Sequence, residues 1–175
     1  MPRAPGRSVV VPHELEFRRV KVDEGDGSRL VSAMVAEMRE LYWDVGPGAG
    51  SGGLDLDAPD MPKAGPAELG PPYGTFLVGY RDGVAVCGGG LKRLPDGTCE
   101  IKRMYVVPEE RGRGVARVLL HALEDAARDL GYAVARLDTG PRQDHARAMY
   151  LAEGYVEVGN FNANPVATFF GEKRL

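Results

Sequence analysis

Residues 111–116, with the sequence Arg-Gly-Arg-Gly-Val-Ala, have the residue types and the spacing of a phosphate-binding turn. They follow a strand-like run that ends at Pro108, and they open a run whose apolar residues recur at helical spacing. The first amides of a helix lack intrahelical acceptors and carry a partial positive charge, so phosphate binds there readily. The glycines let a ligand approach the backbone without meeting a Cβ atom. The segment therefore predicts a pyrophosphate-binding turn, although the arginines of a helix start can also be merely solvated.

Two common phosphate-binding motifs do not fit this turn. A Walker A loop needs the triplet Gly-Lys-Ser/Thr, which does not follow here. A dinucleotide-binding fingerprint needs a third glycine three residues after Gly114, and the chain has Arg117 there. What remains is Arg/Gln-x-x-Gly-x-Gly/Ala between a strand and a long helix.

This pattern resembles the coenzyme A-binding turn of the GNAT superfamily of N-acetyltransferases. Residues 99–106 resemble the family's central strand, and residues 137–140 (Leu-Asp-Thr-Gly) resemble the strand that follows it. Residues 143–155 read Gln-x-x-Ala-x-x-x-Tyr-x-x-x-Gly-Tyr and are similar to the family's second coenzyme-contacting segment.

The chain departs from the family pattern at two positions. The family most often has Asn where this chain has Gln143, and Phe where it has Tyr155. The resemblance extends over about residues 75–175, whereas residues 1–74 match only in the order of the expected elements.

The resemblance implies how a thioester would be held. In the family, the strand before the turn splays away from its neighbour, and a freed backbone N–H polarises the thioester carbonyl. The residues that it assigns to the coenzyme are Met104, Tyr105, Val106, Arg111, Gly112, Arg113, Gly114, Val115, Ala116 and Gln143.

Tyr150 is the candidate general acid, because it matches the family's tyrosine in the segment 143–155. A phenol has a pKa near ~10, stays protonated at neutral pH and can donate a proton to a departing thiolate. The alternative is an ordinary aromatic residue at the edge of the core.

Glu100 is the candidate general base. A primary amine with a pKa near ~10.4 must lose a proton before it attacks. A carboxylate on the central strand can accept that proton directly or through a water molecule. The alternative is a charge pair between Glu100 and Lys92 or Lys102. Asp138 and Glu37 are weaker substitutes for the base.

Length, composition and charge indicate which broad class of protein the chain belongs to. A chain of 175 residues with 43% hydrophobic residues fits one domain, residues 1–175. A net charge of −3 does not favour nucleic acid. The sequence shows no membrane span, signal peptide, disulfide framework or metal-ligand spacing. These features predict a cytoplasmic protein without a metal.

The expected elements give a mixed α/β (α+β) single-domain fold. The family resemblance implies a mostly antiparallel central sheet flanked by helices, with splayed central strands. The predicted strands are 14–22, 75–80, 84–94, 98–107, 133–138, 154–158 and 167–173, and the predicted helices are 28–43, capped by Ser28, 112–130 and 144–152. The 95–97 turn pairs Cys99 with about Arg93 and Cys87 with about Tyr105.

Two segments are expected to lack regular structure. Residues 1–12 are predicted to be a flexible N-terminus. Residues 46–74 contain eight glycines and six prolines and are predicted to be a mobile loop, either disordered or a lid over the substrate.

The sequence thus predicts an acetyl-coenzyme A-dependent N-acetyltransferase in which the amine of a small molecule or peptide attacks the thioester directly. The alternatives are a coenzyme A-binding sensor or partner-binding domain without turnover, and a transferase of longer acyl groups. The sequence does not fix the oligomeric state and leaves a homodimer open.

Overall fold

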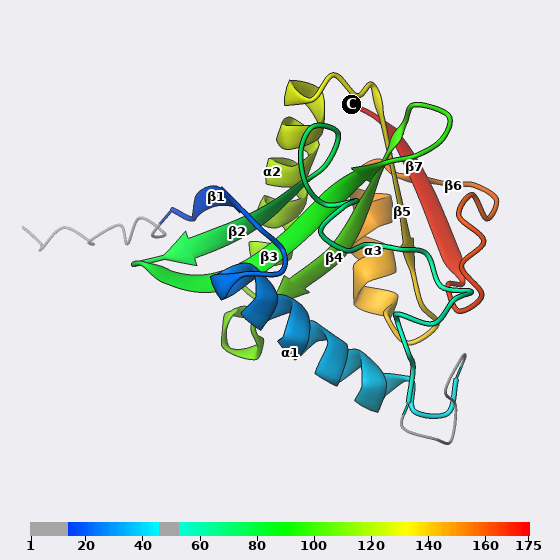
Figure 1. Cartoon of the computed structure of the whole chain (residues 1–175), viewed down its shortest axis with the longest axis horizontal. Helices are drawn as coiled ribbons and strands as arrows, with labels where there is room; N and C mark the ends of the chain where they lie inside the picture. Colours follow the sequence, from blue (N-terminus) through cyan, green and yellow to red (C-terminus); the bar gives the residue numbers. More distant parts are fainter. Residues whose placement is uncertain (1–13, 46–52) are drawn as a thin grey trace, which may run out of the picture.

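A computed structural model of the chain describes residues 14–45 and 53–175 (Figure 1). These residues form one seven-stranded sheet with α-helices packed against it. The elements in chain order are β1 (Glu16–Val20), α1 (Gly25–Leu41), β2 (Thr75–Arg81), β3 (Val84–Arg93), β4 (Cys99–Val106), a 3₁₀ turn (Pro108–Glu110), α2 (Val115–Asp129), β5 (Val134–Thr139), α3 (Asp144–Ala152), β6 (Val156–Glu157) and β7 (Phe169–Arg174). The predicted flexible segment 1–12 lies outside the described residues.

The strands follow the order β1-β2-β3-β4-β5-β7-β6. All neighbouring strands are antiparallel except β4 and β5, which are parallel and are connected through α2. Asp82 and Gly83, both with positive φ, form the two-residue turn between β2 and β3, as the Asp-Gly signal predicts. The predicted mixed and mostly antiparallel sheet is confirmed.

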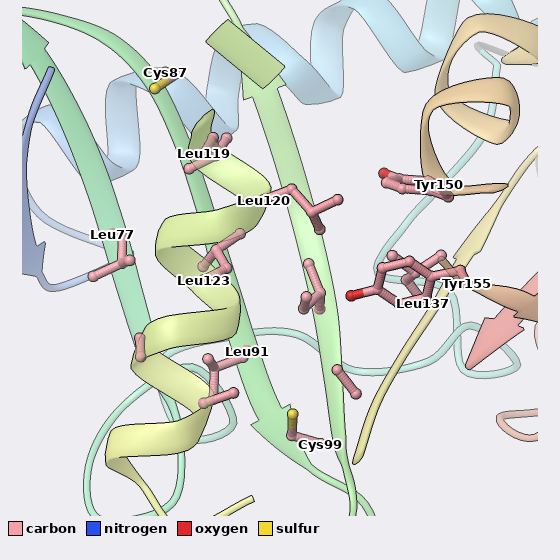
Figure 2. Close-up of a cluster of buried hydrophobic side chains, with 14 of the residues drawn as sticks. Leu77, Cys87, Leu91, Cys99, Leu119, Leu120, Leu123, Leu137, Tyr150 and Tyr155 are labelled. Carbon is pink, nitrogen blue, oxygen red and sulfur yellow. The ribbon is translucent and has the colours of Figure 1, made fainter. Parts of the chain in front are cut away.

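Helices α1 and α2 cover opposite faces of the sheet. A Cβ atom at Gly88 would lie 3.1 Å from Leu30 of α1, and one at Gly89 would lie 2.9 Å from Leu123 of α2. Successive residues of a strand face opposite sides, so the glycines of β3 let both helices approach closely. Figure 2 shows the leucines of α2 packed against the strands in the main core. Among the described residues, no helix is long and apolar enough to cross a membrane.

Strands β4 and β5 stay together over only two residue pairs. Cys99 pairs with Ala135 and Glu100 pairs with Arg136, and the register ends there. Beyond these pairs the two strands diverge (Figure 1). The structure therefore confirms the predicted splaying of the central strands.

The other edge of β4 carries an irregularity at the same level. Gly88 pairs with Tyr105 and Gly90 with Lys102, so Arg103 and Met104 together lie opposite Gly89. A bulge of this kind redirects the side chains around it. It also places Cys87 opposite Val106, one residue beyond the predicted partner Tyr105, whereas the predicted Cys99–Arg93 pair is confirmed.

Two predicted helix starts are wrong. Helix α1 begins at Gly25 with Glu24 as its N-cap, so Ser28 lies inside the helix and does not cap it. Helix α2 begins at Val115 instead of Gly112, because Gly112 and Gly114 both have positive φ, which an α-helix does not accommodate.

The loop that follows α1 is described from residue 53 onward. Residues 53–74 contain no helix or strand, yet Leu54, Met61 and Leu69 are buried. This packing favours a covering loop over a disordered one for residues 53–74, and its mobility stays a prediction. Residues 46–52 lie outside the described part of the chain.

Both cysteines are free and buried. Burial raises the pKa of Cys87 to about 11 and that of Cys99 to about 12. The reactive thiolate form is therefore scarce at pH 8 as well as inaccessible.

We expect the native protein to give no reaction with Ellman's reagent at pH 8 and to release two reactive thiols on unfolding, as the two cysteines of the sequence require. Absorbance at fixed time points with and without denaturant measures this. Rapid labelling of the native protein would show that the core around β3 and β4 opens readily.

Candidate active site

A cavity of about 850 Å³ lies where β4 and β5 diverge. Its walls come from β4, the turn into α2, the ends of β5 and α3, helix α1 and the loop after it. The predicted site residues that line it are Met104, Tyr105, Val106, Arg111, Gly112, Gly114, Val115, Ala116, Gln143 and Tyr150. Arg113 and Glu100 are not part of its lining.

The turn before α2 presents backbone donors to the cavity. The amides of residues 112–114 donate no hydrogen bond to any described residue, and Gly114 is the N-cap of α2. Gly112 and Gly114 have φ values of +73° and +79°. A Cβ atom at either glycine would meet nothing within 4 Å, so the space before these amides is open. The turn can therefore accept an anion, as its sequence predicts.

The arginines of the turn have different surroundings. Arg111 donates from Nε to the carbonyl of Val106 at 2.9 Å and pairs with Glu37 of α1 at 2.8 Å, so it fastens the turn to α1. Arg117 pairs with Glu153 at 2.6 Å beside the cavity. Arg113 is exposed and lies 3.9 Å from Glu110. Arg111 and Arg113 were both predicted to contact the coenzyme, but only Arg111 faces the cavity.

Tyr150 extends from α3 toward β4 (Figure 2). Its hydroxyl donates to the sulfur of Met104 at 3.7 Å, a weak interaction that leaves the proton available. Burial, assisted by the negative charge of Asp138, raises the pKa of Tyr150 above its ordinary value. The phenol therefore stays protonated at any physiological pH and is suited to donate.

Gln143 stabilises the turn between β5 and α3. Its Oε1 accepts hydrogen bonds from the Thr139 hydroxyl at 2.7 Å and from the Gly140 amide at 3.1 Å. The side-chain oxygen is therefore used within the turn, although Gln143 also lines the cavity.

Glu100 lies behind the cavity wall and is fully buried. Its carboxylate pairs with Lys102 at 2.9 Å and lies 3.9 Å from Lys92. Asn162 also donates to it at 2.6 Å. The structure thus shows Glu100 in the charge pair with Lys102 that the sequence offered as the alternative to a role as general base.

Asp138 and Glu37, the weaker candidates for the base, both line the cavity; Glu37 is paired with Arg111, whereas the charge of Asp138 acts on Tyr150. Asp138 lies 3.3 Å from Lys102 and accepts hydrogen bonds from Asn162 at 2.7 Å and Asn164 at 2.9 Å. Burial alone would lower the pKa of Lys102, but the charges of Asp138 and Glu100 outweigh it and raise that pKa. Lys102 is therefore a cation that joins two carboxylates.

The asparagines of this network were missed in the sequence. Residues 160–164 read Asn-Phe-Asn-Ala-Asn just before the last strand, a concentration of amides that could have indicated a polar site. Asn162 bridges Glu100 and Asp138 through one amide nitrogen. These residues come from a loop far along the chain, and only the fold brings them to β4.

Apart from Glu37, the part of the lining that comes from α1 and the following loop is largely apolar. It is formed by Met34, Met38 and Tyr42 of α1 and its C-terminal end, and by Leu54, Leu56 and Met61 of the following loop. Met34 and Met38 of α1 thus face the cavity. Arg103 of β4, one of the basic residues whose clustering near the turn favours a small anionic ligand, also lines the cavity.

Comparison with known proteins agrees with this architecture. The model of the acetyltransferase (GNAT) family matches residues 35–155. The IAA acetyltransferase of Azospirillum brasilense is 33% identical over 149 residues, which cover 83% of this chain and 90% of that protein.

Solved structures share the fold. A GNAT-family acetyltransferase from Staphylococcus aureus Mu50 superposes with a TM-score of 0.69 at 16% identity, over 93% of this chain and 99% of that chain. The PaiA N-acetyltransferase of Thermoplasma acidophilum, solved in complex with coenzyme A, superposes with a TM-score of 0.59 at 14% identity, over 93% of this chain and 99% of that chain. Because the family model matches well over half of the sequence, this chain belongs to the GNAT family of acetyltransferases.

Proposed function

We propose that the protein transfers an acetyl group from acetyl-coenzyme A to the primary amine of a small molecule or peptide by direct attack. The observation that carries this proposal is a single cavity with free backbone amides at one end and Tyr150 and Asp138 in its interior. Acetyl-coenzyme A supplies an activated carbonyl. The chain must anchor it, polarise it and move two protons.

The turn at residues 112–114 would hold the pyrophosphate. Its amides have no other acceptor among the described residues, and its glycines leave open space in front of them. The start of α2 adds the positive end of the helix dipole. The named relative solved with coenzyme A shares this fold, which supports the same assignment here.

The open edge of β4 would polarise the thioester carbonyl. Alternate backbone groups of a strand point to its two edges, and β4 uses only one edge beyond Glu100. The amides of the stretch 104–106 that point toward β5 therefore have no strand partner. A donor fixed in this way stabilises negative charge on an oxygen without reorganising.

Tyr150 would protonate the leaving sulfur. Its hydroxyl lies in the cavity wall, and its raised pKa keeps the proton in place until a strong base forms beside it.

Asp138 would accept the proton of the amine. It lines the cavity, whereas Glu100, the base predicted from its place on the central strand, lies outside the lining and would reach the amine only through a water molecule. In this proposal Glu100 is a positioning residue that holds Lys102 and Asn162 against Asp138.

The direct test of this function is to incubate the protein with acetyl-coenzyme A and a panel of primary amines, and to detect acetylated products by mass spectrometry. We expect at least one amine to be acetylated with release of coenzyme A. Tight coenzyme A binding without any product would instead support the sensor alternative.

We expect Gly114→Ala to lower coenzyme A affinity at least tenfold, because a Cβ atom would enter the open space at the turn that the proposal assigns to the pyrophosphate. Positive φ at this site also makes the substitution cost about 1 to 2 kcal/mol of stability. Gly131→Ala is the matched control, since Gly131 has φ +87°, has open space around it and lies at the other end of α2. Calorimetric titration of both variants measures the affinities. Equal affinities would contradict the anchoring role.

We expect Tyr150→Phe to lower kcat about 100- to 10,000-fold, the usual loss for a general acid, with coenzyme A affinity and melting temperature nearly unchanged. Because the pKa of Tyr150 is raised, the wild-type rate should not decline through loss of this proton below about pH 10. Steady-state kinetics across pH 6 to 10 measures both effects. A kcat within threefold of wild type, with chemistry rate-limiting, would remove Tyr150 from the mechanism.

The variants Asp138→Asn and Glu100→Gln distinguish which of the two carboxylates acts as the base. We expect Asp138→Asn to lose about 100-fold or more in kcat/KM and to lose the limb of the pH profile that reports the base. Glu100→Gln should chiefly lower the melting temperature, because Lys102 and Lys92 lose a buried partner. The reverse result, with the pH limb abolished only in Glu100→Gln, would restore Glu100 as the base.

A further inference from the structure

Arg103 lines the cavity and has no hydrogen-bond or ion-pair partner among the described residues. Its Nε atom is buried and makes no hydrogen bond, and its guanidinium forms no ion pair within 4 Å with any described residue. The two other arginines that line the cavity differ, since Arg111 pairs with Glu37 and Arg117 pairs with Glu153. Arg103 is thus the one unpaired arginine among the described residues of this wall.

This arrangement is unfavourable at the buried Nε atom, although Arg103 as a whole is only partly buried. A buried polar group that lacks a partner destabilises a protein, and a charged one does so more strongly. Burial lowers the pKa of Arg103, and the charges of Asp57 and Glu68 only partly oppose this effect. Asp57 is exposed, and the Glu68 carboxylate already accepts from the Gly65 amide at 3.0 Å. Neither of these two carboxylates therefore pairs with Arg103.

The backbone of Arg103 is also strained. Its φ of +55° lies in the left-handed region, which residues with a Cβ atom seldom adopt. It occurs at the bulge where two residues of β4 lie opposite Gly89. Strain of this kind is concentrated at functional sites, where it directs a side chain.

The surroundings of Arg103 define which anion would fit. The preceding residue, Lys102, is already neutralised by Glu100 and Asp138. The acidic side of this network faces the cavity through Asp138 and suits a protonated amine. Arg103 offers a positive charge in the lining of the same cavity. The apolar wall of α1 and the loop at 54–61 lies across the same cavity.

We propose that the acceptor is a primary amine that also carries a carboxylate and an apolar group, such as an apolar amino acid, and that Arg103 binds the carboxylate. This inference rests on the proposed acetyl transfer and names the class of its acceptor. The planar guanidinium matches a carboxylate through two parallel hydrogen bonds. The amine would then lie toward Asp138, and the apolar group would pack against Met34, Met38 and Met61.

A binding experiment tests the anion site without turnover. Butyrate, 4-methylpentanoate and 3-phenylpropionate, and the corresponding carboxamides, are titrated calorimetrically into the protein saturated with coenzyme A. None of these probes has an amine that could be acetylated. We expect at least one carboxylate to bind about 10- to 100-fold more tightly than its amide, and Arg103→Met to abolish the difference.

Control variants separate recognition from structure. Arg174→Met removes the same charge from an exposed position of β7 outside the cavity and should bind the probes like wild type. Arg103→Met should keep or raise the melting temperature, because Arg103 has no partner to lose. Arg103→Lys, which keeps the charge but loses the planar fork, should recover only part of the affinity.

Kinetics with matched acceptors tests the same site during transfer. Leucine and phenylalanine are compared with leucinamide and phenylalaninamide, using acetyl-coenzyme A. We expect kcat/KM to favour each acid over its amide by about 10- to 100-fold in wild type and in Arg174→Met, but not in Arg103→Met.

Several outcomes would overturn the assignment of Arg103. Equal binding of every carboxylate and its amide, or an Arg103→Met variant that keeps the preference, would contradict it. Reduced coenzyme A affinity in Arg103→Met would assign the arginine to the coenzyme. If Arg103→Met is impaired only when succinyl-coenzyme A replaces acetyl-coenzyme A as the acyl donor, Arg103 binds the carboxylate of the donor and not that of the acceptor. If the protein acetylates only amines that carry no carboxylate, this inference is overturned and the proposed function stands. If it acetylates no amine, both are refuted.

Discussion

The site depends on the parting of β4 from β5 after Glu100. A sheet normally satisfies the backbone groups of a central strand on both edges. Here the parallel register ends after two residue pairs, and the remaining length of β4 borders a cavity instead of a strand. That single interruption creates the space, exposes backbone donors along it and places the start of α2 at one end. The glycines of β3 allow α1 and α2 to pack closely on the opposite faces, so the sheet stays well supported while its centre is open.

Side chains replace the missing backbone pairing. Lys102 of β4 and Asp138 of β5 form an ion pair across the opening, and Asn162 and Asn164 of the last loop complete its hydrogen bonds. Buried charges are tolerated when they are paired and hydrogen-bonded in this way, but they add little net stability. Their benefit here is that they define the position of one carboxylate inside the cavity. Arg103 lies next to this satisfied network and is not part of it, which is why its lack of a partner carries information.

Sequence patterns predicted much of this arrangement. Apolar periodicity and the Asp-Gly turn indicated most elements, and α3 has the predicted bounds. Tyr150 and most of the turn at 111–116, which line the cavity, could be predicted because glycine spacing and a family motif are local signals. The residues that were missed are joined by long-range contacts. No local pattern shows that Asn162 reaches both Glu100 and Asp138, that a bulge turns Arg103 into the cavity, or that Glu100 lies behind the wall. The positive φ values of Gly112 and Gly114 could not be predicted either, and because of them α2 begins at Val115 instead of the predicted Gly112.

A crystal structure of the protein with coenzyme A would test the central claim most directly. If the opening between β4 and β5 is the coenzyme site, the pyrophosphate oxygens will lie within about 3 Å of the amides of residues 112–114. The sulfur of the coenzyme will then lie between the two strands, beside the hydroxyl of Tyr150. A coenzyme bound elsewhere on the protein, or a pyrophosphate that makes no contact with these amides, would contradict the account.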